Sequence, residues 1–98
     1  MGNVEILGMP GVARQLPATA TTANTALSTG CRRISMYVRG YAVRFAISGA
    51  ATTANATTSH FADVGERLDF AVPPGANIAV IRDTGAAGDA TVELTEYA

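Results

Sequence analysis

Lysine and tryptophan are absent from this sequence of 98 residues, and cysteine and histidine occur once each. A single cysteine, Cys31, excludes an internal disulfide and a zinc site built on cysteines. No apolar run approaches the roughly 18 residues of a membrane-spanning helix, so we expect no membrane partner. The formal net charge of −1 excludes a protein that binds nucleic acid mainly by neutralising phosphates.

The residues that are present are small and apolar, with 48% hydrophobic and only 15% charged side chains. Disordered tails are depleted in apolar residues, so we expect a folded chain, and its length suits one domain. Nineteen alanines and twelve threonines leave the core dependent on a few larger side chains, because alanine buries little area. Small domains with modest cores often gain stability by association, which favours a homo-oligomer.

Apolar and polar residues alternate with a period of two in several segments, and no long stretch shows the 3.6-residue period of a helix. The alternation is clearest in residues 33–39, where Ile34, Met36 and Val38 share one face. It resumes after a single glycine in residues 41–48. This pair predicts either a hairpin or a bend within one long strand.

Three further segments of the second half of the chain predict strands. Residues 67–72 alternate and end at a Pro-Pro-Gly sequence, because proline cannot donate to a strand ladder. The nearly continuous apolar run 77–83 predicts a central strand, and residues 90–97 alternate again. The last two runs flank a Gly-rich turn and predict an antiparallel hairpin.

Shorter candidate strands complete the pattern at residues 12–19, 22–27 and 59–63. About seven or eight short strands with regular turns predict an all-β fold, either an antiparallel β-sandwich (jelly-roll-like) or a small barrel. Residues 50–58 predict a polar loop that is flexible unless something covers it. We place an N-terminal arm or first-strand region at residues 1–22 and the sandwich domain at residues 23–98.

Few residues favour catalysis. His60 is the single histidine, and Ser59 beside it would point to the opposite face of a strand, so the two do not predict a nucleophile and its base. Asp83 and Asp89 flank the Gly-rich turn and offer the oxygen ligands that calcium prefers, but solvated turn carboxylates are the simpler interpretation. We therefore expect no enzyme activity, no cofactor and no bound metal.

All seven basic residues are arginines, and four of them lie within residues 32–44. Arg33 and Arg39 share one face of a strand, and Arg44 lies on the outward side of the next one. These three predict a patch that docks on an acidic protein by bidentate pairing. The alternative is a solvated sheet face, balanced across strands by the acidic residues Glu66, Asp69 and Glu93.

Residues 27–96 resemble the small β-sandwich virion proteins of tailed bacteriophages. The resemblance lies in Arg-Arg-Ile-Ser-Met-Tyr-Val-Arg-Gly, the Thr- and Ala-rich loop, Gly-Glu-Arg-Leu-Asp-Phe-Ala-Val-Pro-Pro-Gly-Ala-Asn-Ile-Ala-Val-Ile-Arg, and a final Ala-Thr-Val-Glu-Leu-Thr-Glu. It implies a capsid cement or decoration subunit on the virion surface, made in the cytoplasm of the bacterial host. The implied partners are the major capsid protein or other virion proteins and further copies of the chain, in trimers or other rings.

In such a protein residues 1–22 predict an arm that lies across an adjacent subunit. Ile6, Leu7 and Met9 would be its apolar anchors, and pairing of an edge strand with another chain would add hydrogen bonds. An ordinary first strand of the same domain is the alternative.

Two other functions stay open at this point. A tail, neck or spike component is the nearest alternative within the virion. A carbohydrate- or surface-binding sandwich module is the alternative from another class. Its aromatic platform would have to come from Tyr37, Tyr41 and Tyr97, and the absence of tryptophan counts against it.

Overall fold

The computed structural model describes residues 10–98, and this part of the chain contains strands and no helix. Its eight strands are β1 (Pro10–Ala18), β2 (Ala23–Ala26), β3 (Arg33–Arg39), β4 (Val43–Ser48), β5 (His60–Ala62), β6 (Arg67–Ala71), β7 (Asn77–Arg82) and β8 (Ala90–Tyr97). The predicted all-β fold is confirmed. Residues 10–98 accordingly include no helix that is long and apolar enough to cross a membrane.

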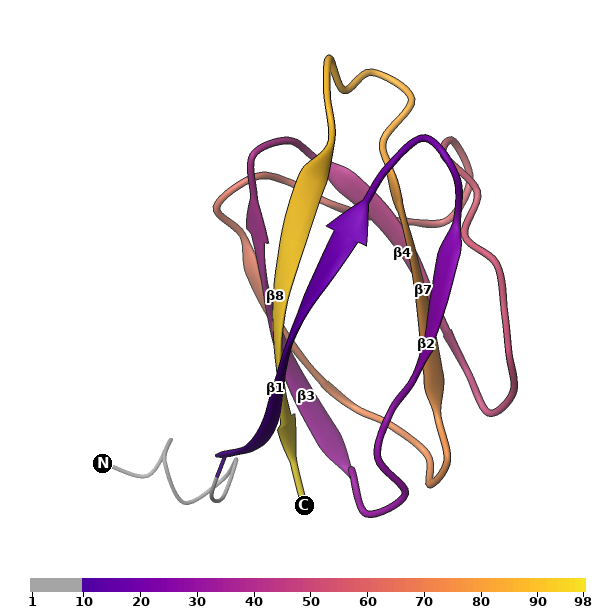
Figure 1. Cartoon of the computed structure of the whole chain (residues 1–98), viewed down its shortest axis with the longest axis vertical. Helices are drawn as coiled ribbons and strands as arrows, with labels where there is room; N and C mark the ends of the chain where they lie inside the picture. The colour runs from indigo at the N-terminus through magenta and orange to yellow at the C-terminus, as the bar shows by residue number, and fades with distance from the viewer. Residues whose placement is uncertain (1–9) are drawn as a thin grey trace.

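The strands form two antiparallel sheets that face each other as the two layers of a sandwich (Figure 1). Sheet A has the strand order β1-β8-β3-β6, and sheet B has the order β2-β7-β4-β5. Within the described chain no strand pairs across the two sheets, so the structure is a sandwich and not a closed barrel. β7 lies between two neighbours, as its continuous apolar run predicts.

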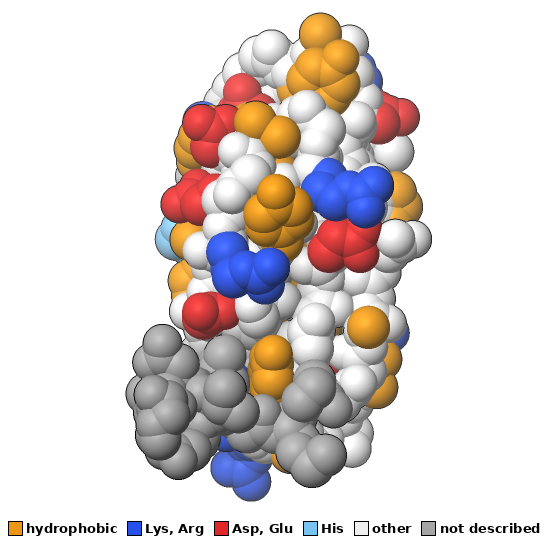
Figure 2. All heavy atoms as spheres, turned by 90° about the vertical axis from the view of Figure 1, so that its left-hand side faces the viewer, with side chains coloured by type: hydrophobic (Ala, Val, Ile, Leu, Met, Phe, Trp, Pro, Cys, Tyr) orange, Lys and Arg blue, Asp and Glu red, His pale blue; other side chains and the backbone are white. Residues whose placement is uncertain are grey.

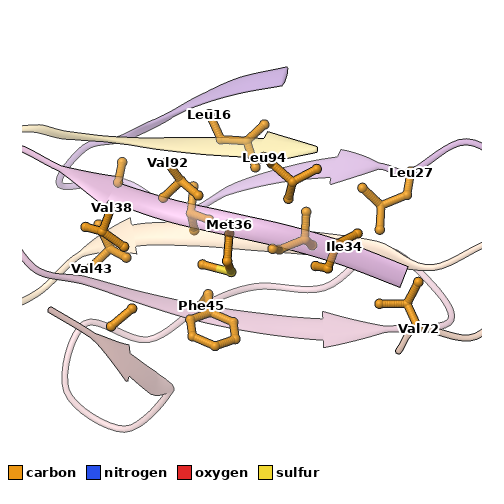
Figure 3. Packing of buried hydrophobic residues seen from close by; sticks show 14 of the residues in the cluster. Leu16, Leu27, Ile34, Met36, Val38, Val43, Phe45, Val72, Val92 and Leu94 are labelled. Atoms are coloured by element: carbon orange, nitrogen blue, oxygen red, sulfur yellow. The ribbon is translucent and has the colours of Figure 1, made fainter. Parts of the chain in front are cut away.

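The main core lies between the sheets and takes side chains from both. Ile34, Met36 and Val38 of β3 are fully buried, as their alternation predicts, and Val92 and Leu94 of β8 lie beside them (Figure 3). Sheet B contributes the inward side chains of β4 and β7, which include Val43, Phe45, Ile78 and Val80. Many remaining core residues are alanines, so these larger side chains provide most of the hydrophobic stabilisation.

The hairpin or bend predicted for residues 33–48 is wrong, and so is the hairpin predicted for residues 77–97. β3 and β4 belong to different sheets, and so do β7 and β8. Gly40 has a φ of 93°, a conformation that glycine adopts readily, and it begins the turn that carries the chain from sheet A to sheet B. Alternation decides which face of a strand is buried but not which strand lies beside it, because both sheets bury their faces in the same core.

The segment 49–59 lies over the outer face of sheet B. Its Ala54 is buried against Ala79 and Ile81 of β7, and the backbone N–H of Ala54 donates to Thr22 Oγ1 at 2.8 Å. The loop predicted at residues 50–58 thus has a covering surface, which is the sheet itself. β7 is consequently packed on both of its faces.

The predicted N-terminal arm is partly a strand of the same domain. Residues 10–18 form β1, which pairs with β8 of the same chain, so the first-strand alternative holds for this stretch. The predicted anchors Ile6, Leu7 and Met9 lie outside the described residues. Their role at an interface stays a prediction.

Candidate interaction surfaces

The outer face of sheet A carries charges that are paired across strands. Glu93 of β8 accepts hydrogen bonds at Oε2 from Arg39 at 2.8 Å and from Gln15 at 2.9 Å. On the neighbouring strands the Arg67 guanidinium lies 5.4 Å from the centre of the Tyr37 ring. Figure 2, which views this side of the molecule, shows basic and acidic side chains interspersed. The face therefore has the mixed charge of a solvated sheet surface and not the single sign of a basic patch.

The three arginines of the predicted docking patch do not lie together. Arg33 and Arg39 lie on the outer face of sheet A, where Arg33 Nη2 donates to the carbonyl oxygen of Ala98 at 3.0 Å. Arg44 lies on β4, on the outer face of sheet B. A single patch made of all three is therefore wrong, because the chain changes sheets between β3 and β4.

Arg44 organises a small cluster of its own. Its Nε donates to Asp83 Oδ1 at 2.8 Å, its Nη1 donates to the carbonyl oxygen of Ser59 at 3.0 Å, and its guanidinium lies 4.9 Å from the centre of the Phe61 ring. The hydrogen bond from Arg44, with a second one from the Gly85 backbone, holds the pKa of Asp83 below its usual value. The cluster joins β4, β5 and the turn that follows β7.

Both carboxylates of the Gly-rich turn are paired with arginines. Asp83 contacts Arg44, and Asp89 Oδ1 accepts a hydrogen bond from Arg82 Nη1 at 2.9 Å. Over residues 10–98 no group of three or more His, Cys, Asp or Glu side chains could hold a metal ion. The geometry thus resembles a turn with paired surface carboxylates more than a calcium loop.

The side chains of Ser59, His60 and Cys31 have different partners. His60 is exposed on β5, with its ring centre 5.5 Å from that of Phe45, and the Ser59 hydroxyl oxygen accepts a hydrogen bond from the backbone N–H of Asn55. Cys31 is free and buried. Burial, together with the negative charge of Glu96, raises the pKa of the Cys31 thiol, which keeps it protonated and weakly nucleophilic.

A buried ion pair that the sequence analysis missed lies near the C-terminal end of β8. Glu96 is only 2% exposed; its Oε2 accepts a hydrogen bond from Arg14 Nε of β1, and its Oε1 accepts one from the Ser28 N–H at 3.2 Å. Burial acts to raise the pKa of Glu96, but the hydrogen bonds from Arg14 and Ser28 outweigh it and hold the pKa below its ordinary value. The pair joins β1, β8 and the turn before β3.

Three of the four exposed large apolar side chains of residues 10–98 lie at or beside one end of the sandwich. We call this the turn end, defined by the turns 40–42, 63–66 and 83–89, and it lies opposite the C-terminus (Figure 1). Tyr41 and Val64 are 42% and 50% exposed there. Phe61 of β5 is 47% exposed. It lies beside these turns, where it pairs with Arg44 near the start of β4. Such patches commonly mark interaction sites.

The tyrosines do not form one platform for a sugar. Tyr37 and Tyr97 share the outer face of sheet A, but Tyr37 lies opposite Glu93 and Tyr97 opposite Arg33, which separates them by about 13 Å along the sheet. Tyr41 belongs to the turn end, where its ring faces Gly88. The carbohydrate-binding alternative therefore gains no support from their placement.

Comparisons with protein-family models, with curated proteins and with solved structures find no match to this chain. The likeness to phage virion proteins rests on the residues quoted in the sequence analysis, and the function drawn from it stays a prediction.

Proposed function

We propose that this chain is a structural subunit of a tailed-bacteriophage virion, a cement or decoration protein that stabilises the capsid by bridging neighbouring capsid subunits. The resemblance of residues 27–96 supports the class of protein. The observation that carries the mode of action is the exposure of Tyr41 and Val64 at the turn end and of Phe61 on the strand beside it. In this proposal the subunit works by burying surface and performs no chemistry.

The physical properties of the turn end suit a docking surface. Three large apolar side chains are about half exposed, so covering each one would contribute on the order of 1 kcal/mol. Ion pairs such as that of Arg44 with Asp83 connect the strands and turns beneath them. A surface that is already ordered loses little conformational entropy when it binds.

The test uses capsid shells that lack the subunit and the purified full chain. We expect the chain to sediment with the shells and to raise their melting temperature. Tyr41→Ser and Val64→Ser should each weaken shell binding about three- to tenfold, because each removes apolar area from the contact. Val12→Ser is the matched control, since Val12 is 44% exposed but lies on β1, away from the turn end.

Three outcomes decide between the alternatives. Failure of the wild-type chain to bind any shell or virion part would remove the proposal. Binding to purified tails but not to shells would move the subunit to the tail, neck or spike. Equal weakening by Val12→Ser and Val64→Ser would show that the turn end is not the docking surface.

A further inference from the structure

Three of the four outermost strands are protected against pairing with another chain. β1 contains two prolines, at positions 10 and 17, and its register is irregular near its start; prolines and bulges both block strand edges. β2 is flanked by the segment 49–59, whose Thr52 N–H donates to Asn24 Oδ1 at 3.1 Å. β5 has only three residues. These edges are poor templates for a further strand.

β6 is the edge that lacks such protection. It spans Arg67–Ala71 without a proline, and among the described strands only β3 pairs with it. Its inward-facing Leu68 and Phe70 are only partly buried against the core, so the rim of the core is open beside this edge. Unpaired backbone groups next to partly buried apolar side chains form a ready site for strand addition.

We propose that β6 pairs antiparallel with β6 of a second copy of this chain, about a two-fold axis at Leu68. The two A sheets then become one continuous sheet of eight strands. Contacts about a two-fold axis use the same surface on both copies. The self-pairing goes beyond the proposed docking to a shell and does not depend on it.

The charges on β6 favour a second copy as the occupant of its edge. Arg67 and Asp69 are both exposed on the outer face of sheet A. In the register centred on Leu68, Arg67 of each copy lies directly opposite Asp69 of the other, which stabilises the pair. Moving the centre by one residue sets either Asp69 opposite Asp69 or Arg67 opposite Arg67, and like charges in opposition destabilise a ladder.

Both charges lack an ion-pair partner within the described part of the chain. The four ion pairs found there involve neither Arg67 nor Asp69. Arg67 only contacts the ring of Tyr37 and donates to the Ser35 hydroxyl at 3.3 Å. In the proposed register each finds its counter-ion in the second copy, and Leu68 of one copy covers Leu68 of the other.

The contact is small. A ladder of about five residues buries less than the roughly 1,200 Å² at the lower end of stable interfaces. We therefore expect a weak dimer in solution that forms at high concentration. On a capsid surface, where copies are held close together, the same contact would be more populated.

Disulfide cross-linking of the full chain tests the register. Opposite residues in an antiparallel ladder have Cα atoms about 4.5–5.5 Å apart, which a disulfide can bridge. Leu68→Cys should therefore form a cross-linked dimer under mild oxidation. Asp69→Cys is the matched control, because its two copies would lie roughly 8 Å apart. Wild type controls for Cys31, which is buried.

Charge exchange tests the pairing without a cysteine. Arg67→Asp and Asp69→Arg should each raise the dissociation constant of the dimer about tenfold or more, since both cross-strand pairs become repulsive. An equimolar mixture of the two variants should form a heterodimer, because one copy then carries two negative charges and the other two positive ones. Sedimentation at several concentrations measures the dissociation constant of each variant and of the mixture. A variant that had lost its fold would not form the heterodimer, so its formation shows that both variants are folded.

Five results would overturn the proposal. Four of them are a wild-type chain that stays monomeric into the millimolar range, a solution trimer, equal cross-linking of Leu68→Cys and Asp69→Cys, and charge variants that do not pair when mixed. Loss of the dimer on removal of residues 1–9 would assign the edge to the N-terminal segment of another copy, which also overturns it. All these measurements are made without shells, so a failure of shell docking is recognised separately.

Discussion

Replacing Arg14 with methionine should leave a carboxylate buried without its counter-ion. Glu96 is 2% exposed, and after the substitution only the Ser28 N–H at 3.2 Å would contact its carboxylate. Removing one partner of a fully buried pair destabilises a protein by about 3–5 kcal/mol. The Arg14 side chain is 28% exposed, so water would replace part of the lost contact, and we expect a loss of about 2–3 kcal/mol.

The pH dependence separates this mechanism from a simple loss of packing. In the wild type the pKa of Glu96 is lowered, so its contribution to stability is present above its ordinary pKa of 4.5 and is lost as the pH falls. In Arg14→Met burial would raise the pKa of Glu96, so the carboxyl becomes neutral in mild acid and its penalty disappears. The stability difference between the two proteins should therefore be largest near pH 7 and shrink as the pH falls past the ordinary pKa of 4.5.

Urea denaturation at pH 7 and at pH 3.5 measures both quantities. A thermal scan at pH 7 should in addition show a melting temperature about 10–20 °C lower in the variant. Arg14→Met/Glu96→Gln should recover much of the loss, because the buried group is then neutral. Arg39→Met is the matched control, since its ion pair with Glu93 is exposed and should contribute less than about 1 kcal/mol. A loss below about 0.5 kcal/mol at pH 7, or one of equal size at both pH values, would refute the reasoning.

Three further outcomes test the fold. Met36→Ala should lower the free energy of unfolding by about 2–5 kcal/mol in urea titrations, because Met36 is fully buried and its loss leaves a cavity. Gly40→Ala should lower the free energy of unfolding by about 1–2 kcal/mol, because Gly40 has a φ of 93°. Gly49→Ala is the control, since no atom lies within 4 Å of the new Cβ, and its melting temperature should stay within a few degrees of wild type. Thr22→Val should speed hydrogen exchange of the Ala54 amide about tenfold, and an unchanged rate would show that this hydrogen bond does not hold the loop.

The strands of this protein are largely predictable from its sequence, and their neighbours are not. Residues 33–39 and 90–97 alternate so regularly that the sequence predicts both the length of each strand and the face that it buries. The partner of each strand depends on which sheet the strand enters. A glycine turn such as that at Gly40 can join two paired strands of one sheet, or it can carry the chain from one sheet to the other. Both hairpin predictions were wrong for this reason. The prediction of one patch made of Arg33, Arg39 and Arg44 was wrong for the same reason.

The buried ion pair was within reach of the same pattern. Glu96 is two residues beyond Leu94 on an inward-facing series, and Arg14 is two residues before Leu16 on another. Two opposite charges at inward positions of separate strands indicate a buried pair, because an isolated buried charge is very unfavourable. The exposure of Phe61 and Val64, by contrast, depends on the packing of turns, and the sequence carries no periodic signal for it.

The position of β8 also constrains the order in which the molecule can form. β8 comes last among the strands of residues 10–98, yet it lies between β1 and β3, and no other described strand joins these two in sheet A. During synthesis β1 therefore has no partner in its sheet until residues 90–97 have left the ribosome. Folding that depends on such distant contacts is slow compared with folding through local hairpins. Sheet A therefore closes from its middle, when β8 enters between β1 and β3.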